Sequence, residues 1–184
     1  MCAHKLHGPK GIGALFIRSP LHPDPILFGG GHANERRAGT ENLAGIAGLV
    51  TALEKFTKTP VFPREKLLAL TNRLVYAVDS LAYQGVILRG SRKYRLSNTV
   101  AFTVRGCDSI TLLAGLDLDG ICASSGSACS SGSLTPSHVL KAMGVPKEEC
   151  HGLVRFSLGR DSNLREVEQV EKALPKLINQ VQRG

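Results

Sequence analysis

The chain changes character at two prolines, Pro60 and Pro63, and this change limits the folds that it can adopt. After Pro63, helical and extended patterns alternate, which is typical of a compact α+β unit. Before Pro60, the sequence predicts one strand, one glycine-rich loop and one helix, too few elements to form a sheet of their own. We therefore expect two parts, a remnant of a larger domain over residues 1–60 and a small α+β domain over residues 61–184.

The elements of each part follow from turn signals and from the spacing of apolar residues. In the first part, a strand is predicted over residues 11–18. Thr40, with Glu41 behind it, is expected to cap a helix over about 42–55. In the second part, helices are predicted over about 64–81, 109–116 (capped by Asp108), 137–143 and 164–181, and strands over about 86–88, 99–104, 121–123 and 154–158.

Composition and charge exclude several classes of protein. The formal net charge is +8, but the basic residues are scattered, and their densest cluster, at 89–95, has no aromatic stacking platform. This favours a solvated basic surface that attracts anionic substrates or acidic partners over a nucleic-acid interface. No run approaches the ~18–20 apolar residues of a membrane span. We therefore expect a soluble, cytoplasmic protein with neither nucleic acid nor membrane as partner.

The five cysteines lack a C-x-x-C pair, and the six histidines do not fall at zinc-ligand spacings relative to them. We therefore expect reduced thiols and no metal site. One thiol stands out, because Cys129 lies within a run of small residues over 124–133. A structural cysteine is normally buried among bulky apolar neighbours, whereas a mobile backbone suits a thiol that must meet a substrate. Cys129 is predicted to be a working thiol on a mobile loop.

Three other positions leave alternatives open. Lys5, near the end of a strand and at a turn, suits Schiff-base chemistry, but a lysine near a terminus is more often simply solvated. Thr40, with the triple glycine at 29–31 and the nearby Arg37, suits a phosphate site, but equally a capped helix after a flexible loop. Arg155 lies within an apolar strand, where it can grip a carboxylate, although alternation favours an exposed side chain.

Motifs that contain these positions occur in a fixed order along nearly the whole chain. They are His4-Lys5 with 8–11, the triple glycine with 36–42, and the segments 125–132, 136–144 and 155–160. In these motifs the chain resembles the C-terminal half of the NifS/IscS-type cysteine desulfurases, pyridoxal 5'-phosphate (PLP) enzymes of aminotransferase class V. The resemblance implies an α/β protein of PLP fold type I, with the small C-terminal α+β domain and the last elements of the large cofactor-binding domain.

The resemblance also implies a role for each residue of the cofactor site. Lys5 would form the Schiff base with PLP and move the Cα proton. His4 would help to hold the phosphate, and Cys2 stands where the family usually has a phosphate-binding serine. Thr40 would reach the phosphate of the cofactor in the partner subunit, which implies a homodimer.

The substrate side of the reaction is implied in the same way. Arg155 would hold the carboxylate of L-cysteine. Cys129 would accept its sulfur as a persulfide, release L-alanine and pass the sulfur to an acceptor protein, for iron–sulfur cluster assembly or another sulfur transfer. The alternatives are a non-catalytic sulfur-relay module, and a selenocysteine lyase or cysteine C–S lyase on the same fold.

The chain departs from the family pattern in three ways. About half of a family member would lie upstream of Lys5, so the isolated chain is expected to be inactive. Ala33 occupies a position that is often Glu. The chain ends at Arg183-Gly184 without the extension that housekeeping members use to dock the iron–sulfur scaffold, so that scaffold is only one possible acceptor.

Overall fold

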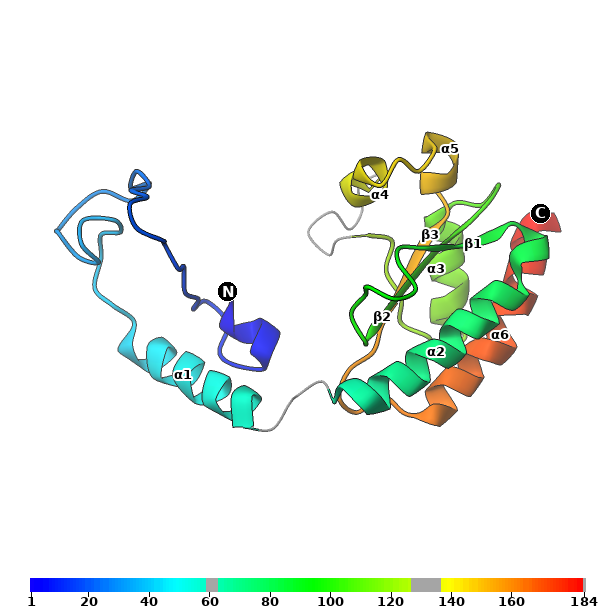
Figure 1. Ribbon diagram of the computed structural model, residues 1–184, viewed down its shortest axis with the longest axis horizontal. Helices are drawn as coiled ribbons and strands as arrows, with labels where there is room; N and C mark the ends of the chain where they lie inside the picture. Colours follow the sequence, from blue (N-terminus) through cyan, green and yellow to red (C-terminus); the bar gives the residue numbers. More distant parts are fainter. Residues whose placement is uncertain (59–62, 127–136, 184) are drawn as a thin grey trace. The chain divides into compact units, whose positions relative to one another are not determined.

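The computed structural model describes residues 1–58, 63–126 and 137–183, and the chain divides into two compact units (Figure 1). The first unit comprises Met1–Val61 and the second comprises Phe62–Gly184. Among the described residues, no helix is both long enough and apolar enough to cross a membrane.

The second unit is built on a three-stranded antiparallel sheet with the order β1-β2-β3. These strands are β1 (Val86–Arg89), β2 (Thr99–Val104) and β3 (Leu153–Ser157), with Val86 opposite Val104 and Thr99 opposite Ser157. Because side chains alternate along a strand, the sheet presents two different faces. Within the described residues, five α-helices accompany it, namely α2 (Arg64–Ser80), α3 (Ser109–Leu118), α4 (His138–Ala142), α5 (Lys147–Cys150) and α6 (Leu164–Arg183).

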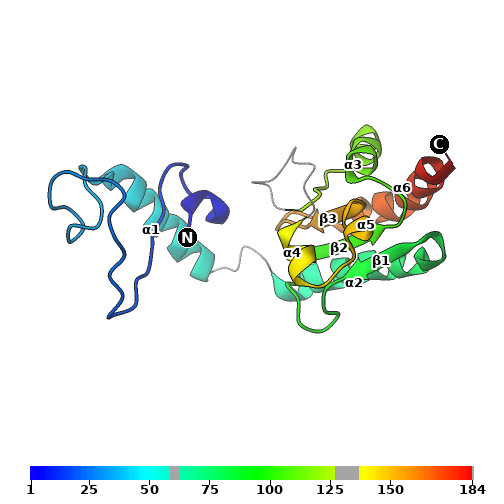
Figure 2. The ribbon, with the colours of Figure 1, turned by 90° about the horizontal axis from the view of Figure 1, so that it is seen from above.

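The main hydrophobic core lies between one face of this sheet and the helices α2, α3 and α6 (Figure 2). Phe102 of β2 and Val154 of β3 are fully buried there. The other face carries a smaller cluster, in which Leu153 packs with Leu140 of α4 and Cys150 of α5. The two short helices therefore cover the face of β3 that also carries Arg155.

Local signals in the sequence explain why two of these helices begin where they do. The carboxylate of Asp108 accepts hydrogen bonds from the backbone N–H and the hydroxyl of Thr111, as an N-cap does. At α6, the side chain of Asn163 accepts from the N–H of Glu166, whose carboxylate accepts from the N–H of Asn163. This reciprocal pair is a capping box.

The first unit contains the 3₁₀-helix η1 (Ala3–Leu6) and the helix α1 (Leu43–Lys58). The strand predicted over 11–18 is wrong, because among the described residues this segment pairs only with the N-terminal segment. Ala3 N–H donates to Ile12 O, and Ala14 N–H donates to Met1 O. Beyond Ala14 the chain continues without strand pairing, and large apolar side chains such as Phe16 (85% exposed) face outward.

Most other predicted elements are confirmed within a few residues, and two further details are corrected. The predicted strand over 121–123 is wrong, because these residues pair with no strand in the part of the chain that the structure describes. Only the next residue, Ser124, forms a single bridge, with Arg155. The predicted cap Thr40 is also wrong, since Asn42 Oδ1 accepts from Gly45 N–H at 2.9 Å. Three short elements were not predicted, namely η1, η2 (Ala82–Gln84) and α5.

Candidate functional site

Lys5 lies in the 3₁₀-helix η1, and not near the end of a strand as its sequence context suggested. The turn is closed by the N–H of Lys5, which donates to Cys2 O, and by the N–H of Gly8, which donates to Ala3 O. Ala3 is fully buried, whereas the side chains of Cys2, His4 and Lys5 are exposed. The turn therefore brings three of the predicted cofactor-binding residues together on one short segment.

The segment that follows this turn packs against the face of α1 that carries Gly45 and Gly48. A Cβ atom on Gly48 would lie 2.4 Å from Cγ of Pro9, a distance that no side chain can tolerate. A Cβ on Gly8 would lie 3.1 Å from Cβ of Ala52, and one on Gly45 would lie 3.2 Å from Cβ of Ile12. Residues 8–12 thus run antiparallel along α1, and η1 lies beside its C-terminal half (Figure 1).

Thr40 lies at the opposite end of α1 from Lys5. It precedes the helix by three residues, whereas η1 is packed near Ala52. At 1.5 Å per residue, the helix from Leu43 to Ala52 is about 14 Å long. The structure therefore does not bring Lys5 and Thr40 together within this unit, and one phosphate group cannot contact both.

The loop before Thr40 reverses direction after the triple glycine. Ala33, Asn34 and Glu35 all adopt the left-handed conformation, with φ of 51°, 54° and 61°, which costs about 1 kcal/mol or more for each such residue. The loop is closed at its base by Ala38 N–H, which donates to Leu27 O at 3.3 Å. Arg37 folds back, and its Nη1 donates to Ala38 O at 2.6 Å.

An ion pair that sequence reasoning missed spans this loop. His32 Nδ1 lies 3.3 Å from Glu41 Oε1, and each side chain is about half exposed, at 47% and 49%. A backbone hydrogen bond at Glu41, and then the charge of His32, hold the pKa of the Glu41 carboxyl below its ordinary value. The two residues are nine positions apart in a loop, so no helical or strand spacing could have predicted the contact.

Arg155 is half-buried, although alternation favoured an exposed side chain. Its Nε atom is fully buried and has no hydrogen-bond partner among the described residues. Its backbone exchanges two hydrogen bonds with Ser124, at 2.7 and 3.1 Å, which fixes the position of the strand at this residue. A buried guanidinium nitrogen without a partner is costly, and a bound carboxylate would satisfy it.

Cys129 itself lies outside the described residues. What the structure does describe is the segment that leads to it, because Ser124 is joined to Arg155 by the bridge above and precedes Cys129 by five positions. The chain re-enters the described region at Ser137, just before α4.

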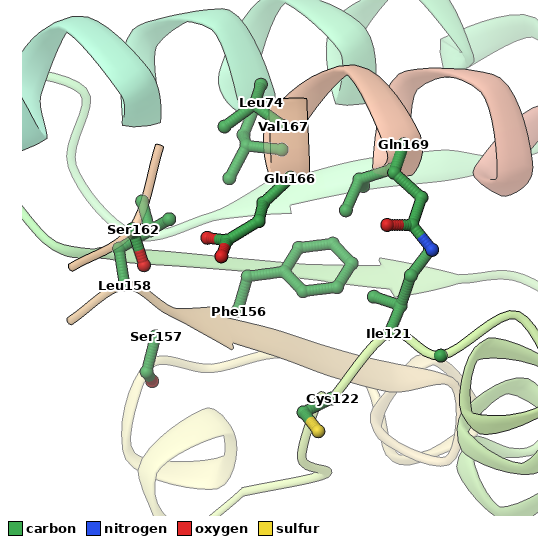
Figure 3. A pocket seen from close by; sticks show the side chains of 12 residues that line it. Leu74, Ile121, Cys122, Phe156, Ser157, Leu158, Ser162, Glu166, Val167 and Gln169 are labelled. Atoms are coloured by element: carbon green, nitrogen blue, oxygen red, sulfur yellow. The ribbon is translucent and has the colours of Figure 1, made fainter. Parts of the chain in front are cut away.

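A cavity of about 310 Å³ opens where the predicted strand over 121–123 would have paired with β3 (Figure 3). Its apolar lining includes Ile121 and Phe156, and its polar lining includes Cys122 and Glu166. None of the residues predicted to bind cofactor or substrate lines this cavity.

The exposed groups of the first unit fit PLP chemically. Lys5 offers an amine for covalent attachment, and His4 and Thr40 offer donors for a phosphate. Among the described residues, these three side chains have no recorded hydrogen bond or ion pair that would compete. In the second unit, the buried Nε of Arg155 is a separate donor, of a kind that suits a carboxylate.

Comparison with known proteins gives a consistent result. The model of the family described as aminotransferase class-V matches residues 1–170. The chain is 42% identical over 182 residues to cysteine desulfurase IscS of Clostridium botulinum, covering 98% of this chain and 46% of that protein. It is 39% identical to cysteine desulfurase NifS of Azotobacter vinelandii over 181 residues, covering 98% of this chain and 45% of that protein.

A solved structure of a NifS-like protein from Rickettsia africae is also similar, with a TM-score of 0.70 and 30% identity over 86% of this chain and 41% of that one. The expected fold class, the α/β fold type I of PLP-dependent transferases, is thereby confirmed. The chain spans less than half the length of these relatives.

Proposed function

The chain belongs to the aminotransferase class-V family, and on that basis we propose that it supplies catalytic residues of a PLP-dependent cysteine desulfurase. The reaction would convert L-cysteine into L-alanine and leave the sulfur as a persulfide on Cys129. The observation that carries the proposal is the buried Nε of Arg155, which has no hydrogen-bond partner in the part of the chain that the structure describes. A substrate carboxylate is the group that its planar fork binds best.

In this proposal, the first unit binds the cofactor. PLP, when bound, supplies an electron sink for the bond changes at the substrate carbons. The Lys5 amine would hold PLP covalently and would take and return the proton at the substrate Cα. His4 would donate a hydrogen bond to the phosphate, beside Cys2, whose thiol is a weaker donor than the serine hydroxyl that the family usually has there.

Thr40 would bind the phosphate of a cofactor held by the partner subunit. The separation of about 14 Å along α1 supports this assignment, because Thr40 and Lys5 of one chain cannot serve the same small molecule. The active form is therefore proposed to be a homodimer with two shared sites.

Cys129 would carry out the sulfur transfer. Its thiolate attacks the substrate sulfur, so that a new S–S bond forms while the bond between Cβ and sulfur breaks. The carbon keeps the electron pair, accepts a proton and becomes the methyl group of alanine. Sulfur is oxidised as the carbon is reduced, so no external oxidant is needed. The persulfide would then pass to a sulfur-acceptor protein.

The test is a chimaera in which this chain replaces the 182 matching residues of the Clostridium botulinum relative. We expect it to form alanine and a Cys129 persulfide from L-cysteine, and Cys129→Ala to lower that rate at least about 10²-fold. Cys122→Ala is the matched control, because Cys122 is an exposed thiol that the proposal gives no part in the sulfur transfer. Alanine formation that survives Cys129→Ala would instead favour the lyase, and a persulfide that forms only with an added donor enzyme would favour the relay.

A further inference from the structure

The ion pair between His32 and Glu41 connects the glycine-rich loop to the segment that contains Thr40. The contact of 3.3 Å joins the start of the left-handed turn to the segment that leads into α1. The hydrogen bond from Ala38 to Leu27 closes the same loop from its other side. The position of the Thr40 hydroxyl relative to the triple glycine therefore depends on this pair.

Glu41 presents an electrostatic problem for a phosphate site at Thr40. Its carboxylate belongs to the residue that follows Thr40, whose hydroxyl would bind the phosphate. The negative charges of the carboxylate and the phosphate would repel each other. The pKa of Glu41 is held below its ordinary value, so the carboxylate remains charged at neutral pH. Neutralising this charge would therefore favour the binding of a phosphate at Thr40.

We propose that His32 is a positioning residue that neutralises Glu41 and thereby sets the affinity of the Thr40 loop for a phosphate group. The inference rests on the proposed role of Thr40. His32 is the only charge recorded against Glu41 among the described residues. Arg37 is engaged with the Ala38 carbonyl, and the remaining charged side chains of the loop are Glu35 and Arg36.

The imidazole of His32 cancels the Glu41 charge only when it is protonated. A His32→Gln variant removes this compensation at every pH, because an amide side chain carries no charge.

The experiment is a calorimetric titration of the 184-residue chain with inorganic phosphate. We expect His32→Gln to weaken binding about twofold to fivefold, the factor that an exposed ion pair controls. The double variant His32→Gln/Glu41→Gln should recover at least the original affinity, because the uncompensated charge is gone. His22→Gln is the matched control, because His22 is an exposed histidine of the same unit that forms no ion pair with any described residue.

A second measurement tests the pair without phosphate. In an NMR titration of the Glu41 carboxyl, its pKa should rise in His32→Gln and stay unchanged in His22→Gln. An unchanged Glu41 pKa, or phosphate binding that is indifferent to His32→Gln, would overturn the inference while leaving Thr40 in place. Phosphate binding that is absent, or indifferent to Thr40→Val, would instead overturn the Thr40 assignment and this inference with it.

Discussion

At the scale of single residues, Arg155 and Lys5 are the two most informative side chains. Arg155 buries Nε without a hydrogen bond, and Lys5 exposes an amine that is not engaged in any recorded ion pair among the described residues. Native proteins satisfy most buried polar groups, so an orphaned guanidinium nitrogen indicates a missing ligand.

Arg155→Lys should therefore impair substrate binding despite keeping the charge. A lysine offers a point charge and cannot form two parallel hydrogen bonds to a carboxylate. In the chimaera we expect KM for L-cysteine to rise at least about tenfold, a cost typical of losing a charged hydrogen bond. Arg160→Lys is the control, because Arg160 is exposed and pairs with Asp161. Equal KM values for the two variants would argue against a carboxylate at Arg155.

Asp108 illustrates a residue whose role is purely structural. It caps α3 through Thr111, and these hydrogen bonds lower the pKa of its carboxyl. Asp108→Ala should lower the free energy of unfolding of the second unit by about 1 kcal/mol, measured by urea denaturation. Asp117→Ala, near the end of the same helix, should leave the free energy of unfolding unchanged. Since the folded pKa is depressed, the contribution of the cap is present above the unfolded pKa and is lost as the pH falls through the folded pKa.

At the scale of elements, the position of η1 depends on the glycine face of α1. Gly48→Ala would place a Cβ 2.4 Å from Cγ of Pro9, so the segment 8–12 must move away from the helix. Overpacking of this kind typically costs about 1–3 kcal/mol. We expect hydrogen exchange at the Ala3 and Gly8 amides to accelerate, whereas Ala47→Ser on the exposed side of α1 should leave it unchanged. Unaltered protection in Gly48→Ala would show that the packing is not tight.

The sequence predicted those elements whose signals are local. Asp108 was predicted to cap α3 and does so, and the strand predicted over 99–104 has the same bounds as β2. Predictions failed where a distant partner decides the outcome. The segments 11–18 and 121–123 both have sequence patterns typical of a strand, but a strand forms only where a neighbouring strand can pair with it. Among the described residues, the first segment pairs only briefly with the N-terminal residues, and the second is followed by a single bridge at Ser124.

The candidate site was predictable only in part, for the same reason. The residue types at Lys5, Thr40 and Arg155 suggested amine, phosphate and carboxylate chemistry. The contact between His32 and Glu41 depends on three consecutive left-handed residues, a conformation that Ala33 and Glu35 rarely adopt and that their identities do not predict.

At the scale of the whole molecule, the two units differ in how much they bury. The second unit has a core that joins three helices to a sheet. In the first unit, few described residues are buried, among them Ala3 and Leu49, while Phe16, Ile26 and Phe28 are at least 84% exposed. An exposed apolar surface of this kind usually marks an interface.

We therefore expect the two units of the isolated chain to open independently. Hydrogen exchange followed by mass spectrometry should show fast exchange through most of residues 1–58 and slow exchange in β2 and α6, since local stability follows buried apolar contacts. Peptides from the two units that exchanged at one common rate would contradict this expectation and would indicate a single cooperative structure.

The distance between Lys5 and Thr40 has a genetic consequence. If each site takes its lysine from one subunit and its threonine from the other, two inactive alleles of the chimaera, Lys5→Ala and Thr40→Val, should complement each other. A mixed dimer would contain one site with both defects and one with neither. Co-expression should then restore about a quarter of the original activity, since half of the dimers are mixed. No recovery in verified mixed dimers would show that each subunit assembles its site alone.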